Sequence, residues 1–195
     1  MCCSNCAVYP VRMLRDEGHS LTGFWFNPNI HPADEYEFRL ESVKKFANLV
    51  STDMLYSEYE PENYLKMFKD FKTNPPRLAK QGTPERCRKC YALRLEKTAE
   101  EASARGLDAF STTLLISPYQ DFEQIAAAGK EAAERYNILF YLRDFRLYFR
   151  ESWEYGKKSG FYRQKYCGCI FSREERFNKN KKLNLRAGIK IVEKF

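Results

Sequence analysis

Seven cysteines are the residues of this 195-residue chain that are best suited to carry chemistry, and they fall into three tight groups. In chain order the groups are Cys2, Cys3 and Cys6, then Cys87 and Cys90, then Cys167 and Cys169. Clustered thiolates bind soft metals or exchange electrons, so their spacing is a strong functional signal. The sequence therefore predicts a redox metalloprotein.

The central pair, Cys87 and Cys90, is predicted to lie on one face of a helix that begins near Pro84. At about 100° per residue, Tyr91 and Arg94 fall on the same stripe of that helix. The partial positive charge of the helix start and the neighbouring basic side chains are expected to lower the pKa of both thiols. We therefore expect thiolates at this pair.

The first group contains the adjacent residues Cys2 and Cys3, which cannot aim at one point from a regular helix or strand. We expect them in a turn that enters the first helix, with Cys6 one helical turn further on. The two CxxC pairs allow a zinc site with four thiolates, but 80 residues separate them. Zinc ribbons usually have about 15 to 20 residues there. An iron-sulfur cluster with four cysteine ligands explains the surplus of thiols better.

The third group, Cys167 and Cys169, has a single glycine between its thiols. Glycine relaxes the backbone, so a small and strained ring disulfide can form there. Strained and accessible disulfides are the labile and catalytic ones, and this pair could store or pass two electrons. The alternative is that both thiols are further metal ligands.

The elements that must position these thiols alternate between helices and strands. Patterning predicts helices over 5–17, 32–50, 61–71, 85–106 and 122–137, and strands over 21–26, 53–58, 110–116 and 138–142. Strands separated by helices predict an α/β fold, with a parallel sheet covered by helices on both faces. We expect residues 1–145 to form this metal-binding domain. Residues 146–195 are expected to be a basic, helical, aromatic-rich extension that carries the CGC motif and packs with the domain as one unit.

The net charge of +7 is concentrated in the last quarter of the chain, where residues 155–195 contain 12 basic and 3 acidic residues. Aromatic residues are interleaved with the bases, which offers phosphate contacts and stacking faces for single-stranded RNA. The candidate phosphate contacts are Lys157, Lys158, Arg163 and Lys165. The alternative is a packed helix with a solvated basic face.

The sequence also indicates a cellular compartment. No stretch reaches the roughly 20 apolar residues that a membrane helix requires. The odd number of cysteines, without an apolar leader, argues against a secreted disulfide scaffold. We expect a cytoplasmic protein with no membrane partner, while the electron donor and the oligomeric state leave no signal in the sequence.

Several motifs together resemble those of the cobalamin-independent epoxyqueuosine reductases, over nearly the whole chain to about residue 175. They are the opening CC with a third metal-binding residue, RCRKCYALRL, STTLLISPYQ, YLRDFR and YRQKYCGCIFS. The resemblance implies an α/β fold similar to that of the adenine-nucleotide α-hydrolases. The chain has no glycine-rich phosphate loop, so no nucleotide hydrolysis is expected. The implied reaction reduces epoxyqueuosine at the wobble position of tRNA to queuosine, with the epoxide oxygen lost as water.

The resemblance also implies roles for the cysteines. The ligands of a 4Fe-4S cluster would be Cys2, Cys3, Cys87 and Cys90, and the redox-active pair would be Cys167 and Cys169. Cys6 could be a ligand of a second iron. The family normally has a strand that ends in a histidine directly before the CC, so we expect residues ahead of Met1 to be missing.

Removing the epoxide oxygen also requires a proton donor. Asp144 follows the carboxyl end of a predicted strand, where catalytic side chains collect, and it is the acidic residue we favour. The other candidates are Tyr91, Tyr119 and Tyr166. The two histidines, His19 and His31, are expected to be surface or loop residues.

Two interpretations from other classes stay open. A zinc-stabilised RNA-binding module without redox catalysis would be colourless, whereas a cluster protein is brown. A thiol–disulfide exchange protein would need one exposed CxxC beside a βαβ unit, and it would leave the other thiols unexplained.

Overall fold

The computed structural model describes residues 1–71 and 83–186, and over these residues helices and short strands alternate. The elements are α1 Ser4–Asp16, β1 Thr22–Trp25, α2 Ala33–Leu49, β2 Asp53–Tyr56, α3 Pro61–Met67, α4 Glu85–Ala104, β3 Ala109–Phe110, the 3-10 helix η1 Thr113–Ile116, α5 Phe122–Tyr136, β4 Leu139–Phe140, the 3-10 helix η2 Arg146–Tyr148, α6 Phe149–Lys158 and α7 Ile170–Arg186. The predicted helices and the first two strands are therefore present, with small differences at their ends.

The strands pair in parallel, as expected for an α/β fold. β1 pairs with β2 from Thr22–Asp53 to Trp25–Tyr56, and β3 pairs with β4 through Ala109–Leu139 and Phe110–Phe140. Within the described residues these pairs form two separate two-stranded sheets. The predicted parallel pairing is therefore present in this part of the chain, but as two short sheets rather than one.

The predicted strand over 110–116 is wrong beyond its first residue. β3 ends at Phe110, and residues 113–116 form η1. The hydroxyl of Thr112 accepts a hydrogen bond from the backbone N–H of Leu114 at 3.3 Å, which caps this short helix. All four residues of η1 are buried, and an apolar run of this length does not distinguish a buried strand from a buried helical turn.

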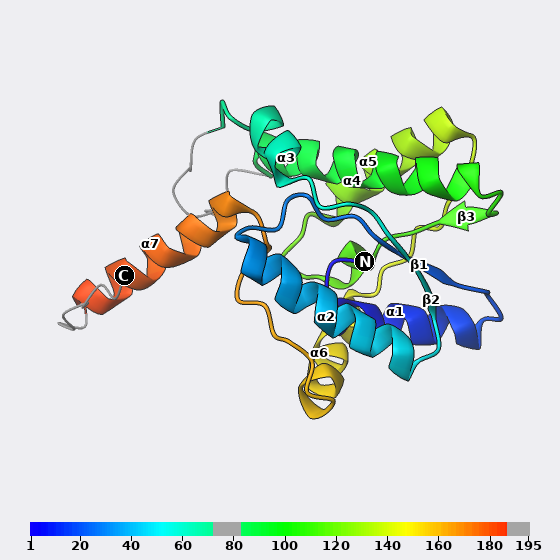
Figure 1. Cartoon of the computed structure of the whole chain (residues 1–195), viewed down its shortest axis with the longest axis horizontal. Helices are drawn as coiled ribbons and strands as arrows, with labels where there is room; N and C mark the ends of the chain where they lie inside the picture. Colours follow the sequence, from blue (N-terminus) through cyan, green and yellow to red (C-terminus); the bar gives the residue numbers. More distant parts are fainter. Residues whose placement is uncertain (72–82, 187–195) are drawn as a thin grey trace.

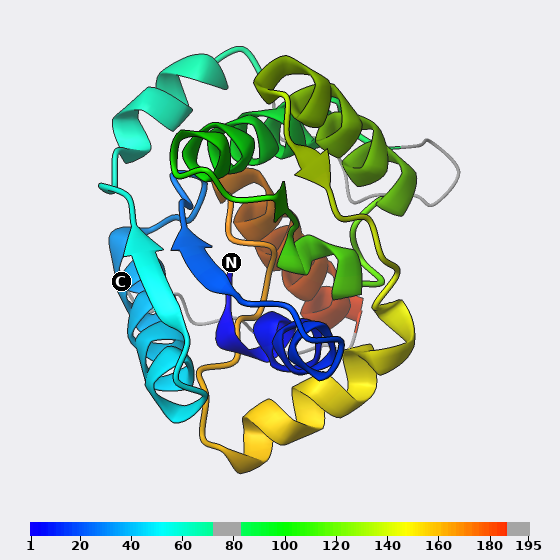
Figure 2. The ribbon, with the colours of Figure 1, turned by 90° about the vertical axis from the view of Figure 1, so that its right-hand side faces the viewer.

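Helices lie on both sides of the strands. Figure 1 shows α4 and α5 above them and α1 and α2 below them, and Figure 2 shows α6 beside α1. Leu95 of α4 and Ile125 of α5 are fully buried in the largest apolar cluster, together with Phe140 of β4. Gly129 of α5 is needed here, because a Cβ atom on it would lie 2.2 Å from the Phe140 ring.

The C-terminal extension packs directly on α1. Ser152 of α6 donates a hydrogen bond to the backbone oxygen of Asn5 at 2.5 Å, and Gly156 lies against the Asn5 side chain. The expected helical character holds for α6 and α7, while residues 187–195 lie outside the described part. None of the helices in the described part is long and apolar enough to cross a membrane.

Candidate metal and redox centre

The start of α1 gathers the first three cysteines. Cys3 is the N-cap residue in an extended conformation, and its Sγ accepts a hydrogen bond from the Cys6 N–H at 3.4 Å. This turn brings the Sγ atoms of Cys2, Cys3 and Cys6 within 4.8 Å of one another. The expected turn at the entry to the first helix is thus confirmed, and its three thiols form a group that could hold a metal ion.

The three thiols perturb one another strongly. Hydrogen bonds from the Cys3 and Cys6 thiols hold the pKa of Cys2 well below its usual range. The same hydrogen bond to Cys2 raises the pKa of Cys3 to about 12. Gln164, from the segment before the CGC motif, donates from Nε2 to the Cys3 Sγ at 2.9 Å. The group therefore favours a single shared negative charge, centred on Cys2.

The other four cysteines line one small cavity, although they come from two distant parts of the chain. They are Cys87, Cys90, Cys167 and Cys169. α4 also contributes Tyr91 and Arg94 to this cavity, which confirms the predicted stripe. Its volume is about 20 Å³, and Gln120 lies on its wall with Nε2 3.8 Å from the Cys167 Sγ.

The expectation of a lowered pKa is wrong for Cys90. Burial raises the pKa of Cys90 to about 12, and the opposing effect of Arg94 is smaller. One of the basic neighbours expected to help, Arg86, is instead paired with Glu175 of α7. Desolvation of the buried thiolate therefore outweighs the charge at the helix start.

Arg94 interacts electrostatically with thiols of both groups. Its Nη2 donates to the Asn27 Oδ1 at 2.9 Å, and the whole residue is buried. Burial acts to lower the pKa of Arg94, but the thiols of Cys2, Cys90 and Cys167 raise it above its usual value. A buried cation that faces thiols from both groups would stabilise negative charge on either of them.

The CGC loop is held by a buried ion pair from α2. Arg39 donates from Nη1 to the Cys167 carbonyl oxygen and from Nη2 to the Tyr166 carbonyl oxygen, both at 3.0 Å. Its Nε donates to the Glu35 Oε1 at 2.7 Å, and the other carboxylate oxygen accepts from the Tyr162 hydroxyl. Arg39 is only 1% exposed. The loop is therefore fixed by its backbone, which leaves its thiols available.

Gly168 is required at the centre of this loop. Its φ of +126° lies in a region that side chains rarely adopt, and a Cβ atom would lie 3.2 Å from the Arg39 Nη1. Its carbonyl oxygen accepts a hydrogen bond from the His31 N–H at 2.8 Å. His31 is a loop residue, as expected, but it is buried against the CGC loop rather than exposed.

The two thiols of the CGC motif differ in exposure and in charge preference. They form no disulfide, and Cys167 is exposed whereas Cys169 is buried. A hydrogen bond from the Cys167 thiol lowers the pKa of Cys169, and the same contact raises the pKa of Cys167. Ser172 also donates from its backbone N–H to the Cys169 Sγ at 3.4 Å. Cys169 is therefore the member of the pair that favours the thiolate.

Asp144 does not lie at the cysteine cavity, where a proton donor would be needed. Its carboxylate accepts a hydrogen bond from the Arg146 Nη2 at 2.6 Å. That contact lowers the pKa of Asp144, so the carboxylate has no proton to give near neutral pH. The structure therefore gives no support to Asp144 as the proton donor.

The predicted RNA contacts are all exposed. They are Lys157, Lys158, Arg163 and Lys165. The guanidinium carbon of Arg163 lies 5.4 Å from the centroid of the Trp153 ring. Their part in RNA binding stays a prediction.

Sequence reasoning missed the residues that support the thiols. Glu35 and Arg39 are four residues apart on a predicted helix, and this spacing of opposite charges was a usable signal. Gln120 and Gln164 carry no such signal, because an isolated glutamine is usually a surface residue.

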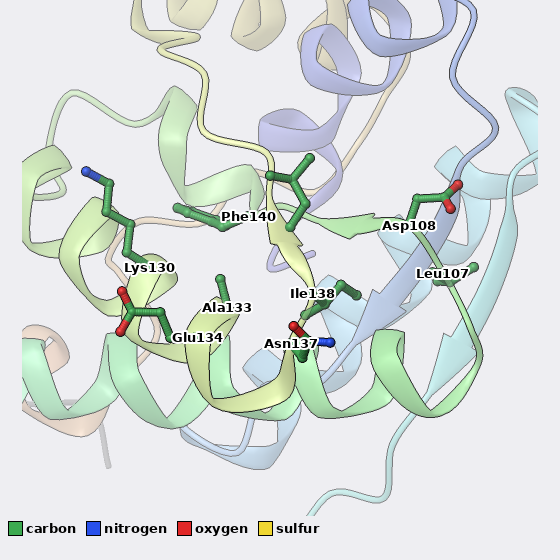
Figure 3. Close-up of a pocket in the computed structure, with 9 residues that line it drawn as sticks. Leu107, Asp108, Lys130, Ala133, Glu134, Asn137, Ile138 and Phe140 are labelled. Carbon is green, nitrogen blue, oxygen red and sulfur yellow. The ribbon is translucent and has the colours of Figure 1, made fainter.

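A second and larger cavity, of about 690 Å³, is lined by residues of α5, of β4 and of the segment before β3 (Figure 3). Residues such as Asp108, Lys130 and Glu134 line it, and no cysteine does. It is therefore separate from the thiol centre.

The fold and these two groups of thiols define an α/β protein whose centre is suited to bind soft metals or to exchange electrons. Residues 1–175 match the family model described as epoxyqueuosine reductase QueH. The "Epoxyqueuosine reductase QueH" of Thermotoga maritima is 37% identical over 193 residues, which cover 96% of this chain and 95% of the relative. The protein of the same name from Dehalococcoides mccartyi is 32% identical, covering 91% and 92%. The chain belongs to the epoxyqueuosine reductase QueH family and is an oxidoreductase.

Proposed function

We propose that this chain reduces epoxyqueuosine at the wobble position of tRNA to queuosine, with an iron-sulfur cluster and a redox-active cysteine pair. The observation that carries the proposal is the family match over residues 1–175, since that span contains all seven cysteines. The family name states the reaction, and the clustered thiols supply the residue types that such a reduction uses.

The donor set fits an iron-sulfur cofactor. Iron-sulfur clusters are held by cysteine thiolates, and this chain brings three thiols together at the start of α1 and four more around the α4 cavity. The cluster ligands that we propose are Cys2, Cys3, Cys87 and Cys90. Cys6, which lies beside the first two, would bind a second iron. The chemistry of the cysteine donors is what supports this cofactor. The cavity volume does not, because it is only about 20 Å³.

When bound, the metals would supply electrons one at a time and an open Lewis-acid site for an oxygen atom. Two buried arginines of the chain would stabilise and position the thiols for that chemistry. Arg94 places a buried positive charge beside thiols of both groups, which favours their ionised state. Arg39 holds the CGC loop through the carbonyl oxygens of Tyr166 and Cys167, so the two thiols keep a fixed position.

The CGC pair can supply both electrons that the reduction requires. Both C–O bonds of the epoxide break, a carbon–carbon double bond forms, and the oxygen leaves as water after taking up two protons. Cys167 and Cys169 provide two electrons and become a disulfide; one proton comes from the Cys167 thiol, and the second comes from solvent because Cys169 favours the thiolate. An external two-electron donor then reduces the disulfide. Cys169 begins this cycle as the more ionised sulfur, and Cys167 carries its proton at the exposed side.

Two finer expectations accompany this function. The parallel strand pairs and the flanking helices agree with a fold similar to that of the adenine-nucleotide α-hydrolases. The basic residues from Lys157 to Lys165 would contact tRNA phosphates, so binding should weaken steeply as salt rises.

The proposal is tested with tRNA that carries epoxyqueuosine, incubated anaerobically with the protein and a chemical reductant. Digestion and mass spectrometry should show the modified nucleoside losing the mass of one oxygen atom. Unchanged nucleoside, with protein that contains its full complement of iron and sulfide, would overturn the proposed reaction.

A further inference from the structure

A row of aromatic rings lies on the surface between the loop before α5 and the helix α6, and the proposed chemistry makes no use of it. The rings belong to Tyr119, Phe149 and Trp153, and we refer to them as the aromatic ladder. The ring centroids of Tyr119 and Phe149 are 5.7 Å apart, and those of Phe149 and Trp153 are 5.8 Å apart. Tyr119 is 71% exposed, so the ladder opens to solvent at that end.

The packing of α6 explains why these rings remain at the surface. α6 buries Ser152 and Gly156 against α1. Phe149 and Trp153 are four residues apart and lie on a different stripe, which continues to the exposed Lys157. Both rings are only partly buried. The helix therefore presents two half-buried aromatic rings and an exposed cation on one stripe, with Phe149 also packed against the largest apolar cluster.

Positive charge accompanies the rings. The guanidinium carbon of Arg163 lies 5.4 Å from the Trp153 centroid, and the exposed Lys157 follows Trp153 by four residues on α6. Exposed aromatic faces with cations beside them are typical of surfaces that bind single-stranded nucleic acid, because every base has a face that can stack. A protein partner would require a more continuous apolar surface than three rings flanked by cations.

Two segments that contribute to this surface continue directly into residues that contact the thiols. Tyr119 directly precedes Gln120, whose Nε2 lies 3.8 Å from the Cys167 Sγ. Arg163 directly precedes Gln164, whose Nε2 donates to the Cys3 Sγ at 2.9 Å. An RNA strand that follows the ladder would therefore pass alongside the thiol centre.

We propose that the aromatic ladder stacks the single-stranded bases beside the wobble nucleotide of tRNA, while Lys157 and Arg163 contact the neighbouring phosphates. This inference rests on the proposed function, since that function supplies the RNA. Stacking on the ladder would hold the anticodon loop so that the wobble base reaches the thiols. The ladder is thus a binding surface, and its rings take no part in the electron transfer.

The binding test uses an unmodified anticodon stem-loop RNA, so that no reduction is needed. The chain has two tryptophans, of which Trp25 is fully buried and Trp153 lies on the ladder. Stacking of a base on Trp153 should quench the tryptophan fluorescence of the wild-type protein. A fully paired RNA duplex of the same length should give little quenching, because its bases are already stacked.

Substitutions separate stacking from charge. Trp153→Ala and Tyr119→Ala should each weaken stem-loop binding by at least about fivefold, because stacking on a single ring contributes that much or more. Trp153→Phe keeps a stacking face, so we expect its affinity to stay near the wild-type value while the quenching signal is lost. The matched control is Tyr56→Ala on β2, an exposed tyrosine that is 48% exposed and should bind normally.

The outcomes distinguish this inference from the proposed function. Unchanged affinity in both alanine variants, or an equal loss of affinity in Tyr56→Ala, would overturn the binding role of the aromatic ladder. This holds whether or not the protein reduces epoxyqueuosine tRNA. Failure of that reduction by a wild-type protein that binds the stem-loop through the ladder would overturn the reaction alone. Thermal unfolding of each variant shows whether a loss of binding is a loss of fold, and Trp153→Phe provides the folded comparison.

Discussion

The guanidinium of Arg39 donates a hydrogen bond to the backbone oxygen of Cys167 at 3.0 Å, which ties the CGC loop to a helix that lies far away in the sequence. The same side chain bonds the Tyr166 oxygen and the Glu35 carboxylate. Three acceptors therefore share one buried cation. Lysine could match the charge but not the planar set of donors that satisfies them.

We expect Arg39→Lys to lower the free energy of unfolding by about 1–3 kcal/mol, since buried acceptors lose their donors. It should also lower the turnover of epoxyqueuosine tRNA more than the affinity for tRNA, because the CGC thiols lose their fixed position. Denaturant titration and steady-state kinetics measure the two effects.

Arg105→Lys is the matched control for that substitution. Arg105 forms an exposed pair with Glu101 four residues away, with a donor–acceptor distance of 2.7 Å. Exposed pairs contribute little, so this variant should change stability by less than about 0.5 kcal/mol. Equal effects of the two substitutions would contradict the role assigned to Arg39.

Serine substitutions at the start of α1 should separate two kinds of iron. Serine is a good N-cap residue, so Cys3→Ser should keep α1 folded while losing both iron and acid-labile sulfide. Cys6→Ser should lose iron but keep its sulfide, because a second iron carries no sulfide of its own. Colorimetric iron and sulfide assays on anaerobically purified protein measure both quantities.

The opposite pattern would change the ligand assignment. Loss of sulfide in Cys6→Ser would move Cys6 into the cluster. Wild-type protein that contains one zinc and no sulfide would instead support a zinc-stabilised module.

Gly156→Ala should loosen the contact between α6 and α1. The new Cβ atom would lie 1.9 Å from the Asn5 Oδ1, and Asn5 is held in place because its Nδ2 donates to the Tyr162 oxygen at 2.7 Å. We expect a loss of about 1–3 kcal/mol from overpacking. This exceeds the gain of up to about 1 kcal/mol that alanine gives over glycine in a helix.

Lys157→Ala provides the comparison on the same helix. Lys157 is exposed, so its removal should change the unfolding free energy by no more than about 0.5 kcal/mol. A Gly156→Ala protein as stable as the wild type in thermal and denaturant unfolding would show that α6 does not pack on α1 in this way.

Tyr59 should make stability sensitive to alkaline pH. Burial raises the pKa of Tyr59 to about 12, from a usual value of 10.0, and its hydroxyl donates to the Ile30 carbonyl oxygen at 2.6 Å. The folded state binds this proton more tightly than the unfolded state does. The corresponding stability is therefore complete below pH 10, and it is lost as the pH rises from 10 towards 12.

The measurement is denaturant unfolding at a series of pH values across this window. Tyr59→Phe cannot ionise, so its stability should fall less steeply with pH than that of the wild type. Identical slopes in the two proteins would contradict the assignment.

The sequence was most informative where local chemistry decides the structure. Adjacent thiols at Cys2 and Cys3 required a turn, and helical spacing placed Cys90 and Arg94 on one stripe, as the structure has them. The family resemblance, carried by motifs from the opening CC to YRQKYCGC, is confirmed over residues 1–175.

The sequence was least informative where tertiary contacts determine the structure. The apolar run after Phe110 fits a strand or a buried turn equally well, and the Thr112 cap selects the turn. The pKa of Cys90 depends on burial that no spacing reveals. The pairing of Arg39 with the Cys167 backbone joins residues 128 positions apart, so nothing local indicated it.

The most direct test of the account is the turnover of epoxyqueuosine tRNA by anaerobically purified Cys169→Ser protein whose iron and sulfide content equals that of the wild type. We expect no queuosine from this variant, because serine cannot form the disulfide that supplies two electrons. Wild-type turnover would contradict the redox role of the pair. A loss of iron and sulfide in both Cys167→Ser and Cys169→Ser would contradict it equally, since these thiols would then be ligands of the metal site.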